Sequence, residues 1–163
     1  MKKIFLFLVL TIGFVCESKA QEYSEIYYYI ETPNKKYGSS FFIYSVQIQN
    51  YGKKMIYNLT SISEGDDVDK EIQELKEKHD WDVYNYSSKY SNDKYDTYSK
   101  YIPGLSGPLW PITSSMTKYF SISKDKQTII RWDDSSSTRN YYKRVTISDL
   151  KEMSAVKIPS FLE

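Results

Sequence analysis

Residues 41–59 read FFIYSVQIQNYGKKMIYNL, and this stretch decides the fold class. Side chains alternate along residues 41–49 with the two-residue period of a strand. One face carries Phe42, Tyr44, Val46 and Ile48, and the other carries Phe41, Ile43, Ser45 and Gln47. Asn50-Tyr51-Gly52-Lys53 follows and is typical of a hairpin turn, because Gly52 can take a positive φ. Residues 55–59 then return as the partner strand.

Further strands are predicted on both sides of this hairpin. Alternation indicates strands over residues 25–31, 81–86 and 140–147, and a second hairpin formed by 119–123 and 127–132. Residues 87–101 suit a loop followed by an edge strand, with a poor helix as the alternative. Residues 103–115 hold three prolines and two glycines, which predicts an irregular loop.

One segment changes to a helical period. Val68, Ile72, Leu75 and His79 recur at steps of four, three and four, which places them on one stripe of a helix over residues 66–79. Acidic residues crowd the start of this segment, where the helix dipole favours negative charge. Ser148-Asp149-Leu150 can begin a single helical turn near the C-terminus.

Composition agrees with a sheet. The chain has 17 tyrosines, all of them after residue 20, and tyrosine favours half-buried strands. Alanine and leucine, which favour helix, are scarce in the same region. The expected fold class is mainly β, bordering on α+β: an antiparallel sheet or a small barrel with one helix at about 66–79.

The first twenty residues have the layout of a secretory signal peptide. Lys2 and Lys3 precede a largely apolar run over residues 4–15, and Ser18-Lys19-Ala20 supplies small residues before Gln21. We therefore expect a leader over 1–20, a single β-rich domain over 21–163, and export to the periplasm, the outer-membrane surface or the medium. A lipoprotein anchored through Cys16 is the alternative. A helix needs about 20 apolar residues to cross a bilayer, and the apolar run of the leader is shorter than that. We therefore expect no transmembrane segment after cleavage.

Several chemistries have no support in the sequence. Formal charge is +1 for the whole chain, and no basic cluster indicates nucleic acid as a partner. Cys16 is the only cysteine and His79 the only histidine, which disfavours thiol nucleophiles and zinc, copper or haem sites. The acidic runs at 66–69 and 133–134 suit a helix start and a hairpin loop better than a calcium site. We expect no catalytic residues, metal or cofactor.

Aromatic residues are the main functional indication. Trp110 lies in the Pro/Gly loop, and four tyrosines precede it: Tyr90, Tyr95, Tyr98 and Tyr101. Exposed rings with polar tips give a large contact area at low entropic cost, and sugars present C–H faces that such rings can cover. These five residues are the predicted ligand-binding surface, with a carbohydrate or another envelope protein as the partner. The alternative is that the rings fill the core and strand faces.

Short sequence pieces resemble small secreted proteins of unknown function from Bacteroidetes. The pieces are the Lys-Lys leader ending Ser-Lys-Ala-Gln, Trp81-Asp82-Val83-Tyr84, Gly107-Pro108-Leu109-Trp110, Ser123-Lys124-Asp125 leading to Arg131-Trp132, and Tyr141-Tyr142-Lys143-Arg144-Val145 followed by Asp149-Leu150. The similarity is concentrated between residues 81 and 150. It implies export and a β-rich fold, and it implies no activity and no residue roles.

Three functions are compatible with these features. The first is a non-enzymatic module that binds a ligand or partner through the aromatic loop surface. The second is a small hydrolase that uses two carboxylates facing each other across a pocket. The third is a barrel that carries an apolar small molecule in its interior.

Overall fold

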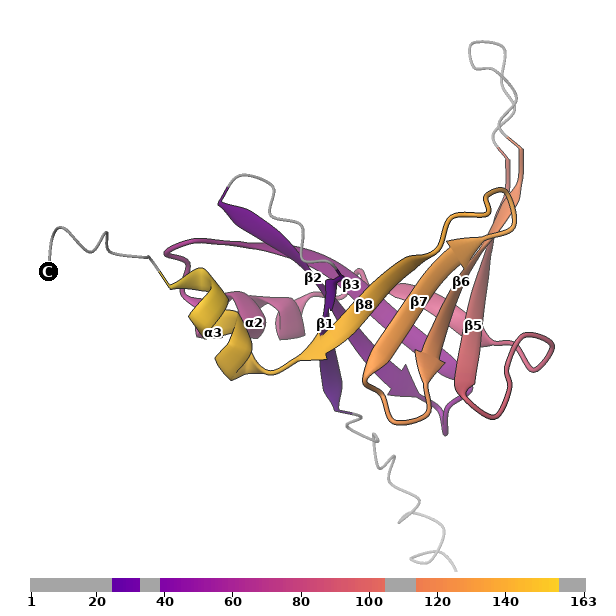
Figure 1. Ribbon diagram of the computed structural model, residues 1–163, viewed down its shortest axis with the longest axis horizontal. Helices are drawn as coiled ribbons and strands as arrows, with labels where there is room; N and C mark the ends of the chain where they lie inside the picture. Colours follow the sequence, from indigo (N-terminus) through magenta and orange to yellow (C-terminus); the bar gives the residue numbers. More distant parts are fainter. Residues whose placement is uncertain (1–24, 33–38, 105–113, 156–163) are drawn as a thin grey trace, which may run out of the picture.

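Eight antiparallel strands close into a barrel in the computed structural model, which describes residues 25–32, 39–104 and 114–155 (Figure 1). Each strand pairs with the next, and the last pairs back with the first. The strands are β1 (Ile26–Glu31), β2 (Ser40–Gln49), β3 (Lys54–Ser63), β4 (Asp82–Tyr86), β5 (Tyr95–Ile102), β6 (Met116–Ser123), β7 (Thr128–Asp133) and β8 (Asn140–Val145). The fold is therefore mainly β, and the barrel, rather than the open sheet, is the architecture.

Both predicted hairpins are confirmed by strand register. Ile48 pairs with Met55 across the β2–β3 turn, and Ile122 pairs with Ile129 across the β6–β7 turn. The ambiguous segment 87–101 is a loop followed by a strand, which is β5. β5 pairs with β6 along its whole length and with β4 on its other side, so it is an internal strand of the barrel and not an edge.

Aromatic side chains fill the middle of the barrel. Phe120 lies at its centre, with its ring centroid 4.9 Å from that of Tyr57 and 5.0 Å from that of Tyr84. Tyr44 and Tyr142 approach to 4.4 Å on another side of the interior. Rings at these separations and tilts make favourable edge contacts in addition to burying apolar area.

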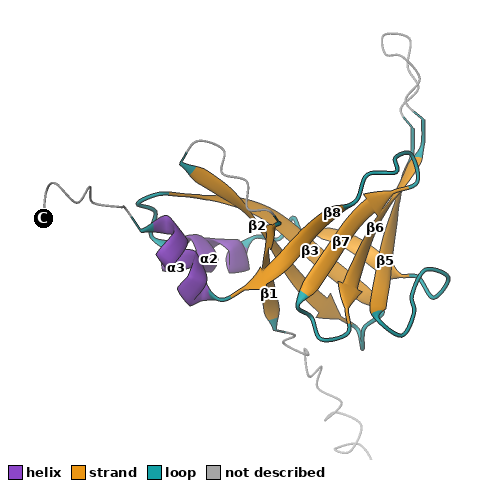
Figure 2. Cartoon of the chain, in the orientation of Figure 1, coloured by secondary structure: helices purple, strands orange, loops and turns teal. Residues whose placement is uncertain are grey.

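A second apolar layer lies outside the barrel. The outer faces of β1, β2 and β3 carry Tyr28, Ile43 and Ile62, and two helices cover them: α2 (Val68–Glu77) and α3 (Ile147–Ser154) (Figure 2). Because β2 is buried on both faces, apolar residues occupy successive positions along it. This explains why residues 41–46 read as a nearly continuous apolar run.

The predicted helix is α2, and its acidic start caps it. Asp67 is the N-cap, and its Oδ1 accepts hydrogen bonds from the backbone N–H of Asp69 and Lys70 at 3.1 and 3.3 Å. Val68, Ile72 and Leu75 form its buried stripe, as expected. His79 lies two residues beyond the last helical residue and is exposed, so it is not part of that stripe.

The chain has a second helix, α3, where only a single helical turn was expected. Thr146 and Asp149 form a capping box: the Thr146 hydroxyl accepts from the Asp149 N–H, and the Asp149 carboxylate accepts from the Thr146 N–H. These hydrogen bonds hold the pKa of Asp149 below its usual value. Leu150 is fully buried against α2 and the sheet, and this packing sustains the helix for eight residues.

Neither α2 nor α3, the helices of the described residues, is long and apolar enough to span a membrane.

Candidate functional site

The tyrosines predicted to form one surface lie on different faces of the barrel. Tyr95, Tyr98 and Tyr101 are spaced three apart on β5, and side chains alternate along a strand, so Tyr98 points inward while the other two point outward. Tyr98 is accordingly 1% exposed and Tyr101 63% exposed. Trp110 lies outside the described residues. The described part of the predicted surface is therefore not one contiguous patch.

Tyr90 belongs to an aromatic cluster on the outer wall. Its ring stands edge-on to Tyr119 and Trp132, at centroid distances of 4.9 and 5.6 Å. Tyr119 and Trp132 stack on each other at 3.9 Å, and the Arg139 guanidinium lies 5.8 Å from the Trp132 ring. The Trp132 indole N–H donates to Ser121 Oγ at 3.2 Å. The rings are thus engaged mainly with one another and with the barrel wall.

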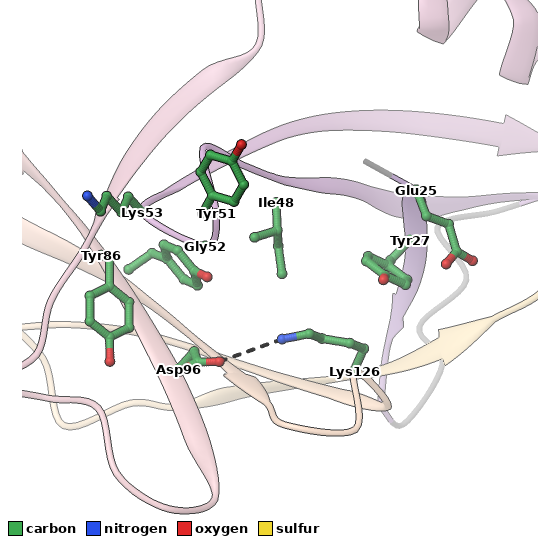
Figure 3. Close-up of a pocket in the computed structure, with 10 residues that line it drawn as sticks. Glu25, Tyr27, Ile48, Tyr51, Gly52, Lys53, Tyr86, Asp96 and Lys126 are labelled. Atoms are coloured by element: carbon green, nitrogen blue, oxygen red, sulfur yellow. Dashed lines mark ion pairs between the residues drawn. The ribbon is translucent and has the colours of Figure 1, made fainter. Parts of the chain in front are cut away.

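A cavity of about 590 Å³ opens at one end of the barrel, which we call the mouth (Figure 3). It lies between the β2–β3 turn, the β6–β7 turn and the start of β1. Four tyrosines line it, namely Tyr27, Tyr51, Tyr86 and Tyr98. Tyr98 and Tyr86 meet edge to face at 5.8 Å, so two of the rings form a preorganised corner of the wall.

Four charged residues share this lining: Glu25, Lys53, Asp96 and Lys126. Glu25 pairs with Arg144 at 3.0 Å, and the Arg144 guanidinium also lies 4.7 Å from the Tyr27 ring. Asp96 pairs with Lys126 at 3.6 Å and also with Lys124. Within the described part of the chain, Lys53 has no ion-pair partner. The mouth therefore combines aromatic walls with two ammonium groups, while both of its carboxylates are also paired with cations from outside the lining.

Hydrogen bonds hold the mouth in shape. The Tyr29 hydroxyl, inside the barrel, donates to the backbone carbonyl of Lys126 at 2.8 Å and ties the β6–β7 turn to the interior. Burial raises the pKa of Tyr29 and of Tyr98 well above the usual value, so both remain neutral phenols at ordinary pH. The floor and one wall of the mouth are thus fixed by buried groups.

The mouth has two carboxylates in its lining, which is the minimum that a carboxylate-dependent hydrolase needs. Glu25 lies near Tyr27 at one side of the cavity, and Asp96 lies near Tyr86 at the other (Figure 3). Each carboxylate is already engaged by a cation, Arg144 for Glu25 and the two lysines for Asp96. These ion pairs favour a role for both acids in positioning cations.

The carboxylates of the two acidic runs accept hydrogen bonds from backbone N–H groups. Asp66 Oδ2 accepts from the Ser63 N–H at 2.7 Å, beside the capping residue Asp67. Asp133 accepts from the N–H and hydroxyl of Ser135, which lowers the pKa of its carboxyl. Across residues 25–32, 39–104 and 114–155, the structure has no group of three or more His, Cys, Asp or Glu side chains suited to a metal.

The β2–β3 turn at the rim is strained. Asn50, Tyr51 and Gly52 have φ values of 51°, 52° and 81°, and the Lys53 N–H donates to the Asn50 carbonyl at 3.0 Å. Glycine and asparagine tolerate this left-handed region, but a tyrosine in it is an outlier. Tyr51 is 89% exposed, so no packing compensates for the strain. Backbone strain of this kind is concentrated at functional sites.

We expect Tyr51→Asn to stabilise the protein. Asparagine takes a left-handed φ at lower cost than tyrosine, and the exposed ring contributes little burial, so the gain should be about 1 kcal/mol. Chemical denaturation monitored by circular dichroism measures it. Tyr101→Asn is the control, because this exposed tyrosine lies in a regular strand and its replacement should give no gain. Destabilisation by Tyr51→Asn would contradict the strain argument.

Of the residues that line the mouth, the predicted aromatic surface includes only Tyr98. Tyr27 and Tyr86 were assigned to strands, and Lys53 and Lys126 to turns, with no indication that the four would meet. Their proximity depends on the pairing of β1 with β8 and on the curvature of the closed sheet. No local pattern carries that information.

Comparison with known proteins finds no matching family model, no similar curated protein and no similar solved structure. Fold alone does not specify function, so function has to be inferred from the chemistry of the mouth.

Proposed function

We propose that this chain is an exported, non-enzymatic binding protein that holds one small ligand in the mouth of its barrel. The observation that carries the proposal is the cavity of about 590 Å³ walled by four tyrosines. Its volume lies within the range of roughly 300–1,000 Å³ that is usual for small-molecule sites. Eight-stranded barrels have an interior that side chains can fill or that can hold one small ligand.

The filled middle of the barrel restricts the ligand to the mouth. Phe120, Tyr84 and Tyr142 are at most 3% exposed, and their rings occupy the centre of the interior. A ligand would therefore contact Tyr86, with Tyr98 packed behind it, and face the strained turn that presents Tyr51. The export assignment rests on the leader sequence, which predicts that the site faces the periplasm or the cell exterior.

A ligand held in the mouth contacts different tyrosines from a ligand held on an outer loop surface. Tyr86, 41% exposed, lines the mouth, whereas Tyr101, 63% exposed, lies on the outer wall. The two are matched tyrosines on strands β4 and β5. Tyr86→Ala removes a phenol ring from the mouth, and Tyr101→Ala removes the same kind of ring from the outer wall.

A neutral fluorescent probe, N-phenyl-1-naphthylamine, tests the proposal in a saturation titration. We expect saturable binding, a dissociation constant about fivefold weaker for Tyr86→Ala, and no change for Tyr101→Ala, since stacking on one ring contributes roughly 1 kcal/mol. Thermal melts of both variants check that the barrel stays folded. Absence of saturable binding, or a loss confined to Tyr101→Ala, would overturn the assignment to the mouth.

A further inference from the structure

We propose that the ligand of the mouth is a small organic anion with a flat apolar body, and that Lys126 binds its charged group. This inference rests on the proposed function and specifies its ligand class. It follows from how the ion pairs around the cavity are distributed.

Both carboxylates of the lining are paired with cations that stand outside it. Glu25 is matched by Arg144 at 3.0 Å, which leaves Asp96 as the remaining carboxylate of the lining. Asp96 faces both Lys124 and Lys126, and Lys53 on the rim adds a third ammonium group. The lining itself has two carboxylates and two ammonium groups, but Arg144 and Lys124 pair with those carboxylates from outside it, so Lys126 only shares Asp96 and Lys53 has no ion-pair partner among the described residues.

The neighbouring acid Asp125 is close enough for its charge to interact with Lys126, but its carboxylate is engaged within the turn. Its carboxylate accepts from the Ser123 hydroxyl at 2.6 Å and from the Gln127 N–H at 3.0 Å, which holds it in the β6–β7 turn. These hydrogen bonds lower the pKa of the Asp125 carboxyl. Asp125 is not part of the cavity lining.

Lys126 is positioned to transfer from Asp96 to a ligand. Its ammonium group lies 3.6 Å from Asp96 Oδ2, a longer pairing than that of Lys124 with Oδ1 of the same carboxylate. The Lys126 side chain extends into the cavity toward Asp96 (Figure 3). When it moves to an incoming anion, Lys124 still neutralises Asp96. Exchanging one partner for another in this way leaves no buried carboxylate unpaired.

The side chains that wall the mouth indicate the shape and polarity of the uncharged part of the ligand. Tyr27 and Tyr86 present ring surface to the cavity, and Ile48 adds an aliphatic side chain near its centre (Figure 3). A flat aromatic or alicyclic body can pack against these groups while its carboxylate, sulfonate or phosphate meets Lys126. The pocket thus suits amphiphilic anions better than fully polar ones.

Two probes that share one ring system test the inference. 8-Anilinonaphthalene-1-sulfonate and N-phenyl-1-naphthylamine differ by the sulfonate, so the ratio of their dissociation constants isolates the contribution of charge. Lys126→Met keeps the aliphatic stem and should weaken sulfonate binding about fivefold while leaving the neutral probe unchanged. Asp96→Asn should shift the ratio in the opposite direction, because it releases Lys126 and removes a negative charge.

Lys143→Met is the matched control for net charge, since Lys143 is exposed on β8 and outside the mouth. It should leave both dissociation constants unchanged. Added salt should weaken the sulfonate probe only. Equal effects of Lys126→Met on both probes, or an unchanged ratio in Asp96→Asn, would overturn the anion assignment while leaving the binding site in place. If neither probe binds saturably, the proposed function itself fails.

Discussion

Raising the pH above about 10 should unfold this protein steeply, because its interior depends on neutral tyrosines. Tyr29, Tyr84, Tyr98 and Tyr142 are at most 3% exposed, and burial raises the pKa of each well above the ordinary value of 10.0. In the unfolded chain these phenols ionise near that ordinary value. Above this value the unfolded state loses phenolic protons that the folded state retains. Alkaline pH therefore stabilises the unfolded state relative to the folded state.

The sign and size of this effect follow from proton linkage. Below about pH 10 both states hold the phenolic protons, so the four tyrosines contribute no pH dependence there. Above it, each costs about 1.4 kcal/mol of folding free energy per pH unit. Together they cost roughly 5 kcal/mol per unit, against a typical total stability of about 5–15 kcal/mol.

Tyrosinate absorbance and circular dichroism, followed in one alkaline titration, measure this prediction. We expect the tyrosinate absorbance of the four buried tyrosines to appear only as the sheet signal is lost. Ionisation of all tyrosines near pH 10 (their ordinary pKa) with the sheet signal retained would contradict a packed tyrosine interior.

Phe120→Ala should be among the most destabilising single substitutions in the chain. Phe120 is fully buried, lies edge to face with Tyr84, and is 5.9 Å from the Arg131 guanidinium. Truncation removes ring contacts on several sides and leaves a cavity that the rigid barrel cannot close. The expected cost is about 3–5 kcal/mol, which lowers the melting temperature on the order of 10 °C.

Thermal and denaturant unfolding of Phe120→Ala, compared with Phe42→Ala, test this cost. Phe42 is the same residue type on β2 but is 40% exposed, so its truncation should cost much less. Equal losses for the two variants would show that Phe120 is not at the centre of the packed interior.

Local patterns in the sequence were sufficient to predict most elements. Alternation located the hairpin of β2 and β3, and the helical stripe of Val68, Ile72 and Leu75 located α2. α3 was underestimated although its signal was present: Thr146 and Asp149 have the three-residue spacing of a capping box. A capping motif followed by Leu150 was a better guide than helix propensity.

Barrel closure and the site could not be predicted in the same way. Closure depends on β1 pairing with β8, for example Tyr28 with Val145, across most of the chain. The mouth combines turn residues such as Lys53 and Lys126, whose polar character is expected of any turn. The predicted tyrosine surface groups Tyr95, Tyr98 and Tyr101, but a spacing of three on a strand places Tyr98 on the opposite face from the other two.

The most direct test of the account is to map where a ligand sits. Backbone amide NMR spectra recorded during titration with 8-anilinonaphthalene-1-sulfonate report this residue by residue. We predict that the largest shifts occur at Ile48, Gly52 and Asp96, around the mouth. Shifts centred instead on Tyr90 and Trp132 of the outer wall, with the amides of the mouth unmoved, would contradict it.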